Sequence, residues 1–168
     1  GNEFHLAIGK TLQSDNPELM KYVGFGNFSI NEFATNSSTL FGHANAAGAN
    51  AVGASFFENT PAFGTTPAEI ESFSAPGSTP ILFDQEGNRL AEPEIRQKPD
   101  IVAPDGTNTT FFGSDVAADP DSDPNFFGTS AAAPHAAAAA GLLKEADPSL
   151  TPSEISTALE TTALDMDD

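Results

Sequence analysis

Cysteine and tryptophan are absent from the chain, and so are long apolar stretches. Without cysteine, neither a disulfide bond nor a thiolate metal site can form. The apolar run from Ala131 to Leu143 is shorter than the roughly 18 apolar residues typical of a membrane-spanning helix, and it contains Pro134 and His135. We therefore expect no membrane span.

Basic residues are scarce. The 168 residues include 6 Lys and Arg against 24 Asp and Glu, which gives a formal net charge of −18. Binding to phosphates needs clustered Lys and Arg, so this composition argues against a nucleic-acid partner and against an anionic membrane surface. Strong acidity keeps a protein soluble and self-repelling, which fits a secreted protein or one from a salty environment.

The start of the chain lacks the basic residues and the apolar run of a signal peptide, and it has no initiator methionine. We therefore expect a fragment of a longer, secreted polypeptide. The 168 residues suffice for one compact domain with a core.

Short strands and two helices are predicted. Residues 4–34 alternate between apolar and polar residues, with a hairpin-like step at Gly26-Asn27. The first helix is expected from Ser130 to about Ala146, and small apolar residues on all its sides predict that it is buried. The second helix is expected to begin with Thr151, Pro152 and Glu154 as N-cap, first helical residue and capping-box partner. The other predicted strands are Asn50–Ser55, Ile81–Asp84 in a hairpin with Arg89-Leu90, and Asp100–Ala103.

Residues 127–135 read Phe-Gly-Thr-Ser-Ala-Ala-Ala-Pro-His and carry the strongest chemical signal. A nucleophilic serine needs an exposed hydroxyl and donors aimed at the developing oxyanion. Gly128 leaves space and allows unusual backbone angles, and a serine at a helix N-terminus lies among unpaired N–H groups. We therefore predict that Ser130 is a catalytic nucleophile. An ordinary N-cap is the alternative, but it requires neither the Gly-Thr before Ser130 nor the Ala-Ala-Ala-Pro-His after it.

This segment resembles the serine motif of the subtilisin-like (S8) peptidases, which reads Gly-Thr-Ser, one residue, Ala or Ser, then Pro-His. Lys98–Pro104 resembles the strand that precedes that motif, Ala51–Ala54 an earlier core strand, and Thr151–Ala163 the closing helix. The resemblance covers residues 39–168, the C-terminal part of such a catalytic domain. Residues 1–38 carry no assignable motif and are interpreted as a β-rich segment or insertion.

The resemblance implies an α/β fold with a mainly parallel sheet flanked by helices, present here as a C-terminal fragment with extra N-terminal β structure. It also implies a serine endopeptidase that hydrolyses peptide bonds through an acyl-enzyme on Ser130. The expected partners are a protein or peptide substrate and the remainder of the same catalytic domain. No cofactor is required.

The triad base is expected outside this sequence, because subtilisin places its histidine about 150 residues before its serine. By resemblance, His135 is a packing residue, and a structural role is expected for His43. His5 lacks the family's His-Gly-Thr-His pattern, and Asn50 is interpreted as structural rather than as the oxyanion donor. Triad members act as a unit, so this piece alone is expected to be inactive.

Four aspartates precede the serine motif, at Asp115, Asp119, Asp121 and Asp123. Calcium binding is conceivable, since carboxylates at alternate positions suit a hard cation, but the EF-hand pattern fails. A solvated acidic loop is the preferred interpretation.

Two further functions stay open. One is a non-catalytic binding or structural module with a subtilisin-like architecture. The other is a sedolisin-type acid peptidase, whose motif also contains Gly-Thr-Ser, although His135 after Ala-Ala-Pro favours the subtilisin-like family.

Overall fold

The computed structural model describes residues 3–16, 19–22, 24, 28–35, 37–111, 113–117 and 119–166. The chain divides into two compact units, Gly1–Ala34 and Thr35–Asp168, and each is considered by itself.

In the first unit, the described residues form no helix or strand. The strands predicted within residues 4–34 are therefore wrong for the described part of that range, and the hairpin step at Gly26-Asn27 lies outside it. The physical reason lies in the alternating apolar side chains. Phe4, Leu6 and Ile8 are 86%, 81% and 61% exposed. An alternating pattern stabilises a strand only where its apolar face is buried against a partner.

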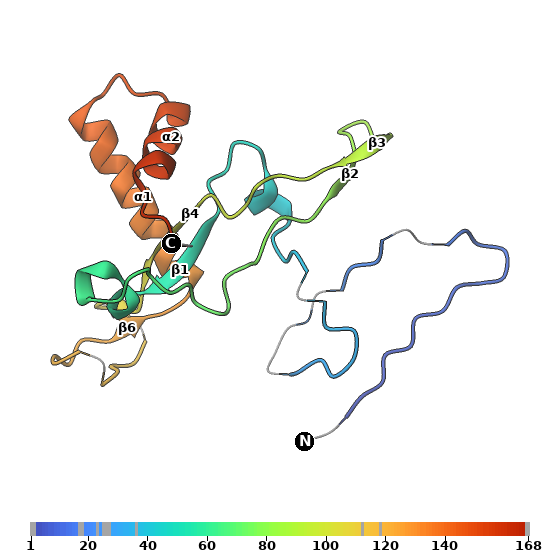
Figure 1. Cartoon of the computed structure of the whole chain (residues 1–168), viewed down its shortest axis with the longest axis horizontal. Helices are drawn as coiled ribbons and strands as arrows, with labels where there is room; N and C mark the ends of the chain where they lie inside the picture. Colours follow the sequence, from blue (N-terminus) through green and yellow to red (C-terminus); the bar gives the residue numbers. More distant parts are fainter. Residues whose placement is uncertain are drawn as a thin grey trace. The chain divides into compact units, whose positions relative to one another are not determined.

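The core of the second unit is a parallel pair of strands covered by a helix (Figure 1). Strand β1 spans Val52–Phe56 and β4 spans Ile101–Asp105, with Val52 opposite Ile101 and Phe56 opposite Asp105. Helix α1, Thr129–Ala146, packs on both strands. The predicted core strands and this helix are confirmed.

The centre of this core consists of alanines. Because these side chains are small, helix and strands approach closely, and little apolar area is buried per residue. The fully or nearly buried members are Ala54, Ala103, Ala132 and Ala136.

The remaining strands form two antiparallel pairs, so one of the three strand pairs in the described part of the chain is parallel. The predicted hairpin is confirmed, and Asp84 closes its turn by accepting hydrogen bonds from the N–H groups of Glu86 and Asn88. The pairs are β2 (Ile81–Phe83) with β3 (Arg89–Glu94) and β5 (Thr107–Asn108) with β6 (Asn125–Phe126), and short 3-10 helices lie at Gly42–Asn45, Phe57–Asn59 and Pro61–Phe63.

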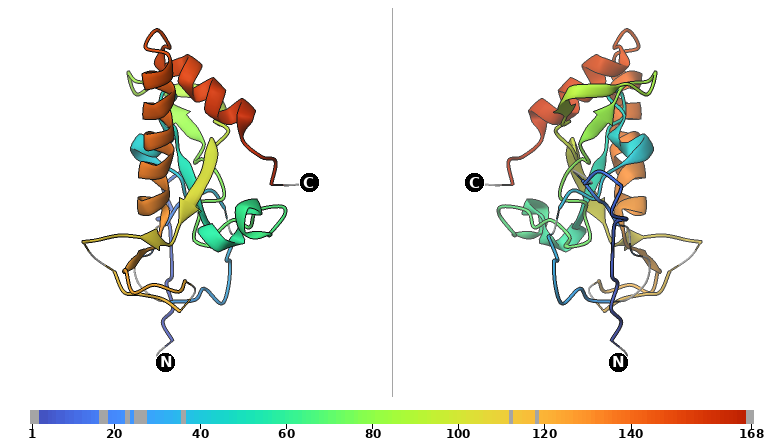
Figure 2. Two further views of the ribbon diagram at one scale, coloured as in Figure 1. Left: turned by 90° about the vertical axis from the view of Figure 1, so that its left-hand side faces the viewer. Right: turned by 90° about the vertical axis from the view of Figure 1, so that its right-hand side faces the viewer.

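Helix α1 is buried on one face only. Ala131, Ala132 and Ala136 are its buried residues, whereas Leu142 is 67% exposed. The prediction of a helix buried on all sides is therefore wrong for this chain, because the strand pair and α2 cover only part of its circumference (Figure 2). No helix among the described residues is long and apolar enough to cross a membrane.

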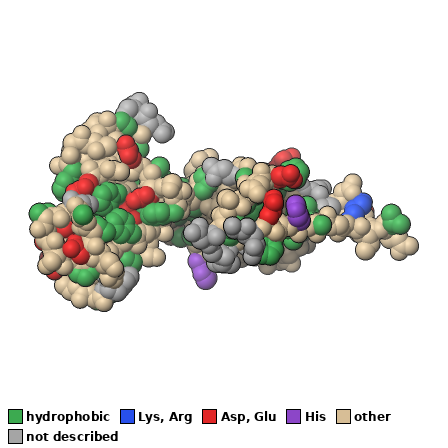
Figure 3. Space-filling model, turned by 90° about the horizontal axis from the view of Figure 1, so that it is seen from below, with side chains coloured by type: hydrophobic (Ala, Val, Ile, Leu, Met, Phe, Trp, Pro, Cys, Tyr) green, Lys and Arg blue, Asp and Glu red, His purple; other side chains and the backbone are tan. Residues whose placement is uncertain are grey.

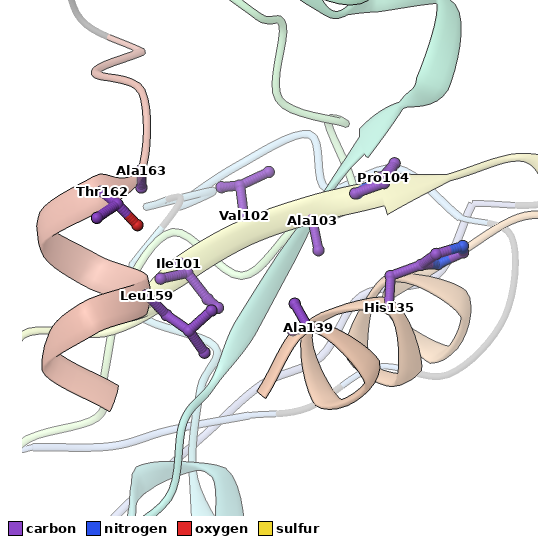
Figure 4. Close-up of a pocket in the computed structure, with 10 residues that line it drawn as sticks. Ile101, Val102, Ala103, Pro104, His135, Ala139, Leu159, Thr162 and Ala163 are labelled. Atoms are coloured by element: carbon purple, nitrogen blue, oxygen red, sulfur yellow. The ribbon is translucent and has the colours of Figure 1, made fainter. Parts of the chain in front are cut away.

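Helix α2, Pro152–Thr162, begins with the predicted capping box. The Thr151 hydroxyl accepts from the Glu154 N–H at 3.3 Å, and the Glu154 carboxylate accepts from the Thr151 N–H at 2.8 Å. Two hydrogen bonds donated to the ionised Glu154 carboxylate, first that of the Thr151 N–H and then that of the Thr151 hydroxyl at 2.7 Å, lower the pKa of Glu154. A pocket of about 360 Å³ lies between α2, α1 and β4, with Leu159, Ile101 and Ala139 in its wall (Figure 4).

Candidate active site

Ser130 is the second residue of α1 and is exposed. The helix N-cap is Gly128, not Ser130, so the alternative that Ser130 is an ordinary N-cap is wrong. The Gly128 carbonyl accepts the N–H groups of Ala131 at 2.8 Å and Ala132 at 3.2 Å. Ser130 therefore lies in the first turn, where backbone N–H groups have no partner within the helix and the helix dipole is positive.

Gly128 has φ 108° and ψ 161°, a conformation that is open essentially to glycine alone. Its N–H group donates to Asp105 Oδ2 at 2.6 Å. The residue two positions before Ser130 is thus held from both sides, by the helix through its carbonyl and by the end of β4 through its N–H.

The two residues after Asp105 continue this attachment. The Gly106 N–H donates to the Phe126 carbonyl at 2.8 Å, and Thr107 Oγ1 lies 3.3 Å from His135 Nε2. Three consecutive residues, from the end of β4 to the start of β5, therefore fix points before and after Ser130. The sequence did not indicate these contacts, because they join segments about 20 residues or more apart.

Gly106 lies beneath two stacked aromatic rings. Phe56, at the end of β1, and Phe127, in the serine motif, have ring centroids 5.5 Å apart. A Cβ added at Gly106 would lie 2.5 Å from the Phe56 ring and 2.9 Å from the Phe127 ring, and the residue has φ 71°. Only glycine fits there without displacing the rings that border the serine motif.

Asn125 connects the acidic loop to the site and is 2% exposed. Its amide Nδ2 donates to the Gly106 carbonyl at 2.9 Å and to Asp119 Oδ2 at 2.8 Å, and its Oδ1 accepts from the Val116 N–H at 3.1 Å. Sequence reasoning missed this residue, since nothing in the local pattern distinguishes it from an ordinary loop asparagine.

The histidines do not supply a general base to Ser130 among the described contacts. His135 Nδ1 lies 2.8 Å from the Ala131 carbonyl oxygen, and its Nε2 lies within hydrogen-bonding distance of Thr107 Oγ1. Both ring nitrogens therefore contact groups within or beside the serine motif rather than the Ser130 hydroxyl. His43 is exposed in a 3-10 helix, and His5 is exposed in the first unit.

The predicted structural role of Asn50 agrees with its contact, since Asn50 Oδ1 accepts from Ser156 Oγ of α2 at 2.5 Å.

In the acidic loop that contains the four aspartates, N–H groups of a side-chain amide and of the backbone hold Asp121. Asp121 Oδ2 accepts from Asn108 Nδ2 at 2.7 Å, and Asp121 Oδ1 accepts from the Asp123 N–H at 2.8 Å. Within the described residues, no three His, Cys, Asp or Glu side chains come together as a metal site would require. Calcium binding, the less favoured interpretation of the four aspartates, stays untested. Acidic side chains are spread among apolar ones on the face shown in Figure 3.

Comparison with known proteins decides the family. The model of the subtilase family matches residues 6–168. The chain belongs to the subtilase family.

Among curated relatives, Subtilisin-like protease SBT2.3 of Arabidopsis thaliana is 33% identical over 157 residues, covering 89% of this chain and 16% of that protein. Subtilisin-like protease SBT5.3 of the same plant is 34% identical over 110 residues, covering 61% of this chain and 14% of that protein. The chain thus spans about a sixth or less of the length of these relatives. No solved structure gives a significant match.

The subtilase match bears on the fold and on how much of the chain resembles the family. An α/β fold follows from the family, and the β1–β4 pair packed against α1 is consistent with it. The match also begins at residue 6, whereas the resemblance found by motif began at about Thr39.

Proposed function

We propose that this chain is the serine-bearing part of a serine endopeptidase, in which Ser130 attacks the scissile carbonyl and forms an acyl-enzyme. The observation that carries the proposal is the geometry at the start of α1. Ser130 is exposed in the first helical turn, and hydrogen bonds on both sides of it fix the backbone. Membership of the subtilase family supports the same reaction.

In this mechanism the Ser130 hydroxyl oxygen bonds to the substrate carbonyl carbon, and the carbonyl oxygen takes up the negative charge. The Ser130 N–H lies in the first helical turn, where it is available to donate to that oxyanion, and the helix dipole adds to the stabilisation. The hydroxyl proton passes to a histidine base, and the leaving amine later receives it. We assign the histidine, its aspartate partner and the side-chain oxyanion donor to the rest of the catalytic domain.

The remainder of that domain is thus a required partner of this chain. Among the described residues, β1 and β4 form a two-stranded sheet with no further strand beside either of them. The outer edge of β1 is occupied at its centre, where the Ala54 carbonyl accepts from the Glu71 N–H at 2.8 Å and the Ala54 N–H donates to Ser74 Oγ at 3.0 Å. We therefore expect any pairing with a further strand at the outer edge of β4. The proposal also includes secretion, which the net charge of −18 supports without requiring it.

The test is proteolysis by the full-length polypeptide that contains this chain. We expect it to cleave unfolded casein, and we expect Ser130→Ala to reduce kcat by at least roughly 10³-fold without changing the Tm. Ser153→Ala, an exposed serine in the first turn of α2, is the matched control and should retain full activity. Full activity in Ser130→Ala would exclude the proposed nucleophile, and absence of cleavage by the unsubstituted protein would favour a non-catalytic binding module.

The isolated 168-residue chain tests the assignment of the base. We expect it to react with a fluorophosphonate probe at least roughly 10³-fold more slowly than the full-length protein, because the triad acts as a unit. Equal rates would place a functional base within this chain.

A further inference from the structure

Asp105 is a buried carboxylate beside the serine motif. Its side chain is fully buried, and it is the largest such side chain among the described residues. Asp105 Oδ2 accepts the Gly128 N–H at 2.6 Å, whereas Oδ1 is buried and has no hydrogen-bond partner among the described residues.

Burying a carboxylate with one unpartnered oxygen lowers the stability of the folded state. A carboxylate transferred from water to an apolar interior loses its hydration, and one charge-assisted hydrogen bond compensates only part of that loss. Close by, burial raises the pKa of Glu71, and the negative charge of Asp105 raises it further. Within the part of the chain that the structure describes, a second acid lies near Asp105 and no Lys or Arg forms an ion pair with it.

The one hydrogen bond that Asp105 makes is directed at the turn before Ser130. Gly128 has a positive φ of 108°, and its N–H donates to no other acceptor among the described residues. If that N–H lost its acceptor, the peptide before Gly128 could rotate, and the rotation would alter the direction of the chain entering α1. A displacement of about 1 Å at a nucleophile is enough to cost roughly 100-fold in rate.

We propose that Asp105 is a positioning residue for Ser130, which holds the Gly128 peptide in the orientation that presents the serine and its N–H to the substrate. This inference rests on the proposed function. Asp105 does not itself contact the substrate; it acts through the backbone of Gly128.

The test compares two substitutions in the full-length polypeptide. Asp105→Asn keeps a carbonyl acceptor and loses the charge, whereas Asp105→Leu keeps the approximate shape and loses the acceptor. The readout is the maximal rate at which a fluorophosphonate modifies Ser130, measured on folded protein and separated from probe affinity. We expect Asp105→Leu to slow this rate by roughly 10- to 100-fold, and Asp105→Asn to retain it within about threefold.

Asp100→Asn is the matched control, because Asp100 Oδ2 also accepts a backbone N–H at 2.6 Å, that of Ala51 at the opposite end of the same strand pair. It should leave the modification rate of folded protein unchanged. An unchanged rate in Asp105→Leu, or equal losses in Asp105→Asn and Asp105→Leu, would overturn the inference.

A second measurement does not depend on catalysis. In the full-length polypeptide, hydrogen exchange of the Gly128 amide should be at least about tenfold faster in Asp105→Leu than in the unsubstituted protein, and nearly unchanged in Asp105→Asn. Unchanged exchange in Asp105→Leu would overturn the inference even if Ser130 is the nucleophile. Failure of the proposed function would appear separately, as absence of Ser130 modification in the unsubstituted full-length protein.

Discussion

At each end of the β1–β4 strand pair, a carboxylate accepts a hydrogen bond from a backbone N–H group. The two carboxylates differ in whether a positively charged side chain lies beside them. At the amino end, Asp100 accepts the Ala51 N–H at 2.6 Å, and Lys98 Nζ lies 2.8 Å from each of its oxygens. At the carboxyl end, Asp105 accepts the Gly128 N–H at the same distance, and no cation pairs with it among the described residues.

This difference separates a structural contact from a functional one. The Lys98–Asp100 pair is 4% and 14% exposed, and each charge is compensated by the other. Asp105 instead lies against the turn before the candidate nucleophile, and its Oδ1 has no hydrogen-bond partner among the described residues. Active sites commonly retain such unfavourable groups, and the stability that they cost is supplied elsewhere in the fold.

The largest effect on stability is expected at the amino end. Asp100→Asn leaves the nearly buried Lys98 ammonium without its counter-ion, so the free energy of unfolding should fall by about 3–5 kcal/mol. Urea denaturation of the 168-residue chain measures it, with the exposed Asp115→Asn as control. A loss below about 1 kcal/mol would show that the two ends do not differ as described.

A pair of glycine substitutions tests whether the backbone before Ser130 is special. One glycine caps the start of α1, and the other lies within the helix. Gly128→Ala forces a side chain onto φ 108° and should lower the free energy of unfolding by about 1–3 kcal/mol and slow Ser130 modification. Gly141→Ala, where an added Cβ meets no atom within 4 Å, should raise that free energy by about 0.5–1 kcal/mol. Equal effects of the two substitutions in urea denaturation would remove the special role of Gly128.

A smaller effect is expected where the first residue of β5 contacts the C-terminal end of the serine motif. Thr107→Val keeps the shape of the side chain and removes its hydrogen bond to His135 Nε2, at a cost of about 1 kcal/mol. The shift in the midpoint of urea denaturation reports it, and Thr110→Val on the exposed loop should be neutral. If Ser130 modification slowed as much as in Asp105→Leu, Thr107 would share the positioning role.

The smallest effect is expected far from the serine, at the capping box of α2. The pKa of Glu154 is lowered by folding, so its contribution to stability is present above its ordinary value of 4.5 and is lost as the pH falls through the lowered value. Glu154→Ala should therefore lower the Tm at pH 7 and have less effect at pH 3. The same pH dependence in Glu160→Ala, an exposed residue of the same helix, would contradict a specific cap.

Local patterns predicted much of this fold. The capping box at Thr151, the strands at β1 and β4 and the start of α1 near Ser130 depend on residues adjacent in sequence, so they could be predicted. The burial of α1 could not, because it depends on which segments lie around the helix.

The residues of the candidate site also fall into those that the sequence predicted and those that it did not. Ser130 was indicated by its neighbours, whereas the contacts of Asp105 and Asn125 join segments separated by many residues and leave no local pattern. The strands predicted in residues 4–34 were wrong in the described part, because alternation alone does not supply a buried face.

The central claim is that Ser130 is the nucleophile of a subtilase, and mapping the site of a fluorophosphonate adduct tests it most directly. After reaction of the full-length polypeptide and digestion to peptides, mass spectrometry should place a single adduct on the hydroxyl of Ser130 within Phe127–His135. An adduct on another serine, or none on an enzyme that cleaves casein, would contradict the account.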